Sequence, residues 1–148
     1  MEIIFKIKRF KDLSTTEMYL LLQLRSEVFV VEQNCVYQDI DGKDEKAIHV
    51  LGYYNNELAA YSRIFNKGYY FDEASIGRVI VSPKYRDKKF GHLLMRVSMN
   101  AIKENFNETA ITISAQEYLK NFYESHGFVQ TSEMYLEDDI PHIQMKKN

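Results

Sequence analysis

The segment from residue 74 to residue 102 constrains the fold more than any other part of the chain. It begins with "ASIGRVIVS", whose β-branched residues predict a strand, and Pro83 then ends the hydrogen-bond ladder because proline has no backbone N–H. The next six residues, "KYRDKK", hold four cations, and an apolar pattern with helical period begins at Phe90 and Gly91. The segment therefore predicts a strand, a basic turn and a helix in succession, as is typical of α/β proteins.

Periodicity and turn residues predict the elements before this segment. Residues 3–9 alternate as a strand does. Residues 14–33 have a helical period that opens with capping-box spacing, S-x-x-E. Two strands in residues 47–65 would meet at Asn55 and Asn56, since asparagine tolerates the positive φ of a hairpin turn.

The elements after the segment complete the fold class. We expect a strand in 109–114, a short helix in 117–128 that stops at Gly127, and two last strands in 128–136 and 141–147. The order β-α-β-β-β-α-β-α-β-β contains two strand–helix–strand crossovers. It predicts an α/β fold with a mixed, twisted central sheet and helices on both faces.

Composition limits the classes of function. The 148 residues contain no linker or low-complexity segment, so we expect a single domain over 1–148. A net charge of −2 gives no reason to expect a nucleic-acid partner. There is no apolar run of about 18 residues, so we expect no membrane association. The only cysteine, Cys35, excludes an intrachain disulfide and a cysteine metal cluster, and this favours the cytoplasm. "DIDGKD" at 39–44 lacks the glycine and glutamate placement of a calcium loop, so we expect a turn and no metal.

The basic turn lies where a helix can bind an anion. The first N–H groups of a helix have no partner within it, and the helix dipole makes that end positive. Cations there are unfavourable unless an anion offsets them, which favours a phosphate ligand. A solvated basic loop accounts for the spacing equally well. Neither the Walker motif nor the dinucleotide-binding G-x-G-x-x-G occurs in the segment.

The turn resembles the pyrophosphate loop of the GNAT superfamily of N-acetyltransferases. The family signature V-x-P-x-x-R-x-x-G-x-G runs here from Val81 through Pro83 and Arg86 to Gly91, with Lys89 in place of the first glycine. Lysine at position 89 costs little conformational free energy if its φ is negative. If its φ is positive, the backbone of the loop is strained. "NFYESHGF" is similar to a later motif of the family. "LRSEVFVVEQNCVYQDIDGKD", "IGRVIVSP", "ISAQ" and "IPHIQM" look like the ElaA subgroup, so the resemblance covers most of the chain.

The resemblance implies an acetyl-CoA-dependent N-acetyltransferase. Enzymes of this family move an acetyl group from acetyl-CoA to a primary amine in a ternary complex, and the pantetheine lies between the fourth and fifth strands, which splay apart. The acceptor would be a small-molecule or peptide amine of unknown identity. The sequence leaves the oligomeric state open, including a homodimer. The residues that would bind acetyl-CoA are the backbone of Val79 and Val81, the amides of Arg86, Asp87, Lys88, Lys89, Phe90, Gly91 and His92, and also Gln116 and Asn121.

The reaction would need an acid, an oxyanion donor and a base. By the resemblance, Tyr123 would protonate the departing CoA thiolate and the Val81 amide would stabilise the oxyanion. The chain has eleven tyrosines, and most tyrosines fill cores, so a structural role of Tyr123 is the alternative. The base stays open between His142, an acidic residue and a chain of water molecules. The acidic run at 137–139 could attract a cationic amine, although such runs in hairpins are usually only solvated.

The resemblance also implies that the first helices cover the acceptor cleft. A second function stays open. The residues expected near the cleft are Arg25, Glu32, Gln33 and Cys35. A thiol nucleophile at Cys35 is one interpretation, and a small buried residue is the simpler one. The alternative function is a non-catalytic acetyl-CoA-binding sensor or scaffold, because Lys89, Gln116 and the lack of a clear base depart from the family's pattern.

Overall fold

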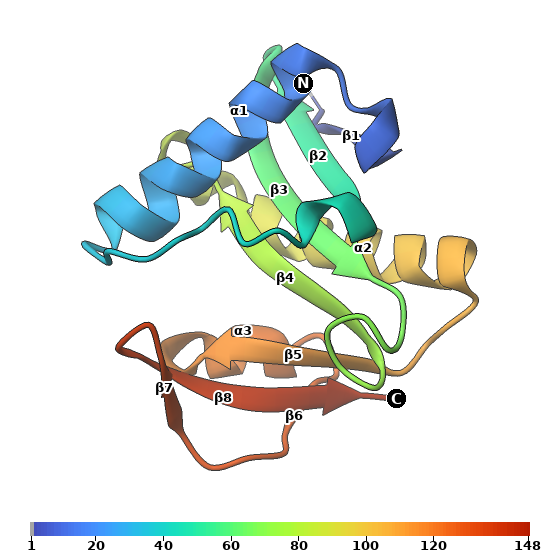
Figure 1. Cartoon of the computed structure of the whole chain (residues 1–148), viewed down its shortest axis with the longest axis vertical. Helices are drawn as coiled ribbons and strands as arrows, with labels where there is room; N and C mark the ends of the chain where they lie inside the picture. Colours follow the sequence, from blue (N-terminus) through green and yellow to red (C-terminus); the bar gives the residue numbers. More distant parts are fainter. Residues whose placement is uncertain (1) are drawn as a thin grey trace.

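The computed structural model describes residues 2–148 and places eight strands in one mixed sheet (Figure 1). The strand order is β1-β2-β3-β4-β5-β8-β6, and β7 pairs with β8 off this path. Within residues 2–148, no helix has the length and apolar character that a membrane crossing requires. The strands are β1 (Ile4–Arg9), β2 (Ile48–Tyr54), β3 (Glu57–Phe65), β4 (Ala74–Val81), β5 (Ile111–Gln116), β6 (Val129–Gln130), β7 (Tyr135–Glu137) and β8 (Ile140–Lys147). The helices are α1 (Thr15–Arg25), the π-helical η2 (Ser26–Glu32), α2 (Phe90–Phe106) and α3 (Lys120–Glu124), with short 3-10 segments η1 (Phe10–Asp12), η3 (Asp44–Lys46), η4 (Pro83–Lys88) and η5 (Glu117–Leu119).

Local sequence signals account for where several elements begin and turn. Ser14 Oγ accepts the N–H of Glu17 at 3.0 Å, and Glu17 Oε1 accepts the N–H of Ser14 at 2.8 Å, which is the predicted capping box of α1. Asn55 and Asn56, with φ of 52° and 61°, join β2 to β3 as expected. Gly127 has a φ of 93° just beyond α3, which confirms the predicted helix stop.

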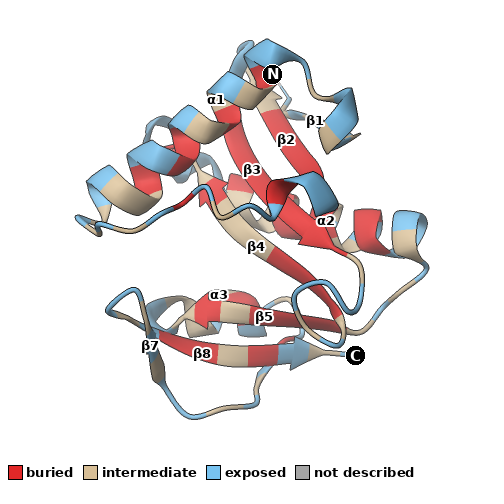
Figure 2. Ribbon diagram, viewed as in Figure 1, coloured by how far each residue is buried: buried red, intermediate tan, exposed pale blue. Residues whose placement is uncertain are grey.

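The sheet is covered by helices on both faces, as predicted. Neighbouring residues of a strand point to opposite faces. On β2, Val50 therefore packs in the cluster that contains Leu94 of α2 and Tyr123 of α3, whereas Leu51 packs in the cluster that contains Leu21 of α1. Figure 2 shows the buried residues along the central strands and the exposed ones on the outer sides of the helices.

The two predicted crossovers occur, but the end of the chain differs from the prediction. β4 and β5 are parallel across α2, and β5 and β6 run in the same direction because each is antiparallel to β8 between them. The single strand predicted over 128–136 is wrong, since β6 and β7 are separate. Between them Ser132 Oγ accepts the N–H of Gln144 at 2.9 Å, so a side chain interrupts the backbone ladder.

An irregularity in β4 divides the sheet. Between two regular pairs with β3, Ser62 faces both Arg78 and Val79, which is the geometry of a β-bulge. Arg78 has a φ of 49°, a left-handed conformation that is uncommon for residues other than glycine. In the described part of the chain, β4 and β5 pair only through Ala74 and Ser75 of β4 and then separate, as their diverging ribbons show (Figure 1). Beyond these two residues, the facing backbone edges of β4 and β5 are therefore not hydrogen-bonded to each other.

Candidate active site

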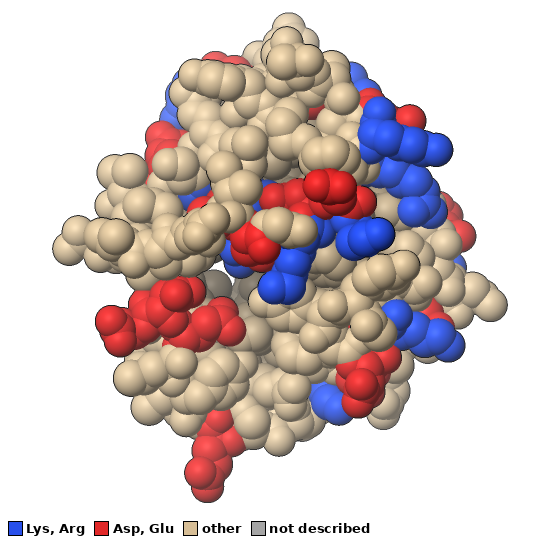
Figure 3. All heavy atoms as spheres, viewed as in Figure 1, with Lys and Arg blue, Asp and Glu red and all other residues tan. Residues whose placement is uncertain are grey.

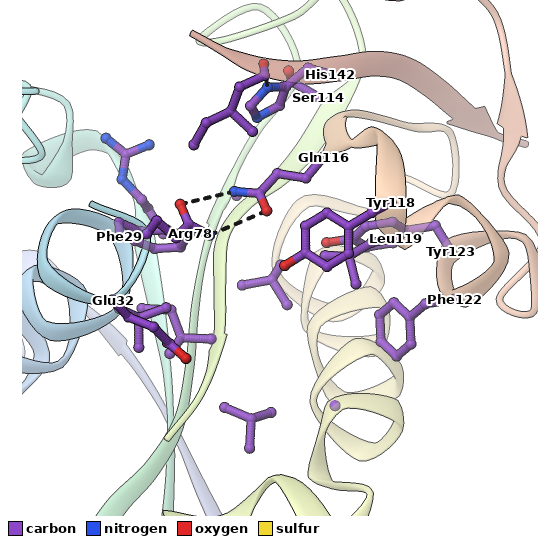
Figure 4. Close-up of a pocket in the computed structure, with 18 of the residues that line it drawn as sticks. Phe29, Glu32, Arg78, Ser114, Gln116, Tyr118, Leu119, Phe122, Tyr123 and His142 are labelled. Atoms are coloured by element: carbon purple, nitrogen blue, oxygen red, sulfur yellow. Dashed lines mark hydrogen bonds between the residues drawn. The ribbon is translucent and has the colours of Figure 1, made fainter. Parts of the chain in front are cut away.

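A cleft of about 680 Å³ lies between β4 and β5 (Figure 4). Phe29 and Glu32 of η2 stand on one side with Arg78 of β4, and Tyr118 and Phe122 stand on the other side. The size is typical of a site for a small ligand or cofactor. The cleft also includes most of the residues that the sequence singled out: Val79, Val81, Arg86, Lys89, Gly91, His92, Gln116, Tyr123 and His142.

The basic turn and the start of α2 form one end of the cleft. Lys89, the last residue before α2, has a φ of 60° and a ψ of 28°. A left-handed conformation costs a residue with a side chain about 1–2 kcal/mol, so lysine at the family's glycine position is strained. The N–H groups of Phe90, Gly91 and His92 belong to the first turn of α2 and lack partners within the helix. A Cβ added to Gly91 would lie 3.4 Å from the ring of Phe122, so glycine keeps this end of the cleft open.

The cations of the turn are partly offset by carboxylates. Nη1 and Nη2 of Arg86 lie 2.5 and 2.6 Å from the two carboxylate oxygens of Glu32, and Nζ of Lys84 lies 2.8 Å from Glu57. Lys89 lines the cleft and makes no ion pair within residues 2–148. The turn is therefore less positive than its sequence suggests, and Lys89 is the cation most available to a ligand.

Three side chains of the predicted loop lie outside the cleft. Asp87 is exposed to solvent, Nζ of Lys88 lies 5.4 Å from the ring centre of Tyr54, and Phe90 is buried with Tyr85. The predicted role of these residues used their backbone amides, so it stays a prediction.

The backbone of Val81 faces the cleft. The N–H of Ser82 donates to the carbonyl oxygen of Ala59 on β3 at 2.7 Å, and hydrogen-bonded pairs alternate with non-bonded pairs along antiparallel strands. Val81 is paired with Ala60, so its N–H and C=O point away from β3 and toward the gap beside β5. Nε of Arg86 donates to the Val81 carbonyl oxygen at 3.2 Å. The geometry is compatible with the predicted contacts to a thioester, and those contacts stay a prediction.

Tyr123 is buried beneath the cleft with its hydroxyl turned toward it. The residue is 6% exposed, and its ring packs edge-on against Phe122 and Phe128 with centroids 5.1 and 6.2 Å away. No hydrogen bond joins its hydroxyl to another residue of the described chain, and burial raises the pKa of the phenol. The hydroxyl therefore keeps its proton at neutral pH, and it is not one of the buried polar atoms that lack a partner, so it is open to the cleft.

Gln116, which precedes the family's later motif, and Asn121, which begins it, differ in their position relative to the cleft. Gln116 Nε2 lies 3.2 Å from Oε1 of Gln33, and the reciprocal contact is also 3.2 Å, so the two amides bridge the cleft from β5 to the end of η2 (Figure 4). Asn121 is exposed on α3 and lies outside the set of residues that line the cleft. A cofactor contact is therefore better supported for Gln116 than for Asn121.

His142 is held by two oxygen neighbours at the other end of the cleft. Its Nδ1 lies 2.7 Å from the carbonyl oxygen of Ile140, which can only accept, so Nδ1 carries a proton. Its Nε2 lies 3.4 Å from a carboxylate oxygen of Glu137. Ser114 Oγ donates to the other oxygen of Glu137 at 3.1 Å and contacts the hydroxyl of Tyr135 at 2.6 Å. A neutral His142 directs its lone pair at Glu137, so it is poorly placed as a free base.

A buried ion cluster beside the cleft was not predicted. The expectation that Arg25 covers the acceptor cleft is wrong: Arg25 is fully buried, and its guanidinium binds Asp39 at 2.8 Å and Asp44 at 2.7 Å. Arg63 reaches Asp44 at 3.0 Å and also binds Asp41. The segment 39–44 is thus an anchor for buried arginines rather than a simple turn. These partners lie 14 to 22 residues apart in sequence, so no local pattern indicates them.

The π-helical geometry of η2 was also missed. The predicted helix over 14–33 has the right extent, but its last part, Ser26–Glu32, is a π-helix. The wider turn brings Phe29, Glu32 and Gln33 to the cleft, together with Cys35, whose Sγ lies 3.2 Å from the carbonyl oxygen of Asp138. Such segments are frequent at functional sites, but no sequence motif marks this one.

Comparison with known proteins decides the family. Residues 11–148 match the family described as an acetyltransferase (GNAT) domain. The chain belongs to the GNAT acetyltransferase family. Protein ElaA of Escherichia coli strain K12 is 46% identical over 138 residues, which is 92% of this chain and 90% of ElaA. The resemblance to the ElaA subgroup of GNAT proteins is thus confirmed.

Solved structures of GNAT proteins share the fold. The crystal structure of E. coli ElaA superimposes with a TM-score of 0.92 at 42% identity and covers 99% of this chain and 100% of that one. An acyl-CoA N-acyltransferase from Pseudomonas aeruginosa gives a TM-score of 0.94 at 40% identity, with the same coverage. The PaiA N-acetyltransferase of Thermoplasma acidophilum, solved with coenzyme A, shares the fold at 16% identity with a TM-score of 0.71 and covers 99% of both chains. Membership of this family supports acyl transfer from CoA.

Proposed function

We propose that the chain is an N-acetyltransferase that moves an acetyl group from acetyl-CoA to a primary amine by direct attack in a ternary complex. The feature that most supports this function is the cleft between β4 and β5. A helix N-terminus with a basic turn lies at one end, the unpartnered hydroxyl of Tyr123 lies within, and Glu137 lies at the other end. A phosphate-bearing thioester and a cationic amine can therefore meet in one site.

Acetyl-CoA would lie along β4. Its pyrophosphate would accept hydrogen bonds from the amides of residues 86–92, and the side chain of Lys89 would add charge. The pantetheine would pair with the exposed backbone edge of Val79 and Val81, in the gap left by the bulge at Arg78. Gln116 would have to release Gln33 or bind the pantetheine beside it.

The chemistry would use three groups on the cleft wall. The amine nitrogen attacks the thioester carbon, a C–N bond forms, and the N–H of Val81 donates to the oxyanion. When the C–S bond breaks, the sulfur takes a proton from the hydroxyl of Tyr123, which is later reprotonated from solvent. The amine gives its proton to Glu137, directly or through water. We prefer Glu137 to His142 as base because the Glu137 carboxylate lines the cleft and is oriented by the hydroxyl of Ser114, which donates to it at 3.1 Å.

The acceptor would be a cationic primary amine. Glu137 and Asp138 line the cleft near the turn between β7 and β8. Figure 3 shows acidic side chains gathered over this end of the molecule, beside the hollow that separates its two halves. Such a surface raises the local concentration of an ammonium ion and disfavours an anionic acceptor.

A CoA-binding module without turnover is the second candidate. The Gln33–Gln116 bridge across the cleft and the engaged state of His142 favour it. The deciding experiment combines CoA calorimetry with acetyl-CoA consumption over a panel of amines, peptides and antibiotics. Consumption that is lost in Tyr123→Phe supports the enzyme. CoA binding without consumption on any acceptor supports the module, and absence of CoA binding to folded protein rejects both.

A further inference from the structure

Two histidines face each other at the phosphate end of the cleft. Nδ1 of His92 lies 2.9 Å from Nε2 of His126, and the ring centroids are 5.0 Å apart. The ring of Phe122 packs against both, with centroids 4.9 Å from His92 and 5.3 Å from His126. His92 is in the first turn of α2 and lines the cleft, whereas His126 follows α3. The contact therefore joins the helix of the phosphate loop to the helix that carries Tyr123.

The distance between the two nitrogens limits how many protons the pair can hold. Only one hydrogen fits between them, so one imidazole donates and the other accepts. The neutral pair has two protons on its four ring nitrogens. A third proton gives a charge of +1 and leaves an N–H on both outer nitrogens, Nε2 of His92 and Nδ1 of His126. A fourth would set two N–H groups against each other, so the intact pair can gain one charge and no more.

The surroundings of the pair disfavour an added proton. Burial lowers the pKa of His126, and repulsion from His92, when that ring is protonated, and from Arg96 lowers it further. Phe122 presents only an apolar ring, and Lys89 lies just before α2 on the same cleft wall. In residues 2–148, no carboxylate pairs with either imidazole. An added proton therefore meets cations and an apolar ring, and no compensating negative charge.

We propose that the His92–His126 pair is part of the phosphate-binding site for CoA and takes up one proton when CoA binds. This rests on the proposed function, since it requires CoA as the ligand. Side chains in the first turn of a helix lean toward its N-terminus, where the phosphate would lie. The outer N–H of His92 then donates a charge-assisted hydrogen bond to a phosphate oxygen. The proton comes from solvent, and no bond of CoA changes.

Proton uptake can be measured without any acceptor amine. We would titrate CoA into the protein at pH 7 in two buffers of different ionisation enthalpy, because the difference in heat counts the protons taken up. The matched variant is His92→Asn combined with His126→Gln, whose amides keep a hydrogen bond near the same positions and cannot be protonated. We expect the wild type to take up more protons than the double variant, by a difference approaching one. The affinity of the wild type for CoA should rise more steeply than that of the double variant as the pH falls from 7.5 to 6. The difference in slope should be up to about tenfold per pH unit.

Controls separate the sources of protons and the causes of failure. Dephospho-CoA lacks the phosphate monoester, which itself titrates near pH 6. If wild type and double variant still differ in proton uptake on binding dephospho-CoA, the pair binds the pyrophosphate. If their uptake becomes equal with this ligand, the pair binds the 3′-phosphate. His142→Gln, at the other end of the cleft, should keep the wild-type uptake.

Equal uptake in wild type and double variant, with CoA bound by both, overturns this proposal alone. Absence of CoA binding to folded wild type overturns the proposed function as well. If the double variant does not fold, the histidine NMR shifts of the wild type decide, and a pKa unchanged by CoA contradicts the proposal.

Discussion

Arg86 and Glu32 form a bidentate ion pair at the phosphate end of the cleft. The guanidinium lies 2.5 and 2.6 Å from the carboxylate oxygens, and its Nε also donates to the carbonyl oxygen of Val81. The hydrogen bond to Arg86 lowers the pKa of Glu32, and the same bond raises the pKa of Arg86, so both stay charged at neutral pH. The pair links the turn after β4 to the end of η2, and it places a negative charge beside the proposed phosphate site.

Removing that negative charge should strengthen CoA binding. In Glu32→Gln the guanidinium is free to contact a phosphate, and we expect the affinity for CoA to rise about two- to fivefold at low ionic strength. Higher salt should reduce the gain, because exposed charges are screened. Calorimetry with CoA measures both effects. Glu57→Gln is the control, since it breaks the Lys84 pair in the same turn but lies outside the cleft and should change affinity less. Equal affinities of Glu32→Gln and wild type would contradict the placement of the phosphates.

The strain at Lys89 can be separated from its charge. Lys89→Ala and Lys89→Gly remove the same charge, but only glycine adopts a φ of 60° without strain. We expect the glycine variant to be more stable than the alanine variant by about 1 kcal/mol, measured by denaturant unfolding. Both should bind CoA more weakly than the wild type, and to a similar degree. If alanine is as stable as glycine, the residue is not strained as the structure indicates.

Local sequence signals predicted most of the fold. The capping box at Ser14, the hairpin at Asn55 and the stop at Gly127 depend on neighbouring residues, so the sequence alone reveals them. The division of β6 from β7 was missed because it depends on Ser132 capturing the N–H of Gln144, twelve residues away.

The candidate site was predicted where it followed the family's motif and missed where it depends on distant contacts. The motif located Val81, Gly91 and Tyr123, all of which line the cleft. Nothing in the sequence around Arg78 indicates its left-handed φ, because an arginine in a β-branched run predicts regular strand. The ion cluster is likewise formed by segments that meet only in the folded chain.

The ion cluster should control stability and its dependence on pH. Asp44 binds both Arg25 and Arg63, so Asp44→Asn leaves two buried guanidinium groups without a shared carboxylate. We expect a loss of about 3–5 kcal/mol in the free energy of unfolding. Glu108→Gln, in the more exposed pair with Lys67, is the control and should stay within about 0.5 kcal/mol of the wild type.

The same cluster fixes the direction of the pH effect. Burial alone would raise the pKa of Asp44, but the hydrogen bond and charge of Arg25 outweigh it and lower the pKa. The folded pKa thus lies below the unfolded value of about 3.9, so the stabilisation is complete above that pH and is lost as the pH falls through the folded pKa. Urea unfolding measures the free energy of unfolding at each pH. Between neutral and acidic pH this free energy should fall less for Asp44→Asn than for the wild type. An equal fall in both proteins would show that Asp44 is not the origin of the acid sensitivity.

Gly91 should be required for CoA binding rather than for folding. A Cβ there would lie 3.4 Å from Phe122 and 3.8 Å from Val81, both on the cleft wall, so Gly91→Val places two methyl groups where the phosphates would approach. We expect CoA binding to be abolished and the melting temperature to change little. Gly77→Ala is the control, because a Cβ at Gly77 meets nothing within 4 Å. Intact affinity in Gly91→Val would show that the phosphates bind elsewhere.

The strongest test of catalysis is Tyr123→Phe. The hydroxyl has no partner in the described chain, so its removal breaks no contact of the free protein and the buried ring still packs against Phe122 and Phe128. If the hydroxyl protonates the thiolate, it acts only once the C–S bond breaks. Turnover should then fall about a hundredfold or more, while CoA affinity and the melting temperature barely change. Tyr118→Phe is the matched control, since Tyr118 lines the same cleft but is 75% exposed, and it should keep most of the turnover. Steady-state kinetics with the acceptor from the amine panel, beside CoA titration and thermal melts, measure all three quantities. Normal turnover in Tyr123→Phe would assign the proton to water or to another group of the cleft, because a buried tyrosine that only fills space loses nothing catalytic with its hydroxyl.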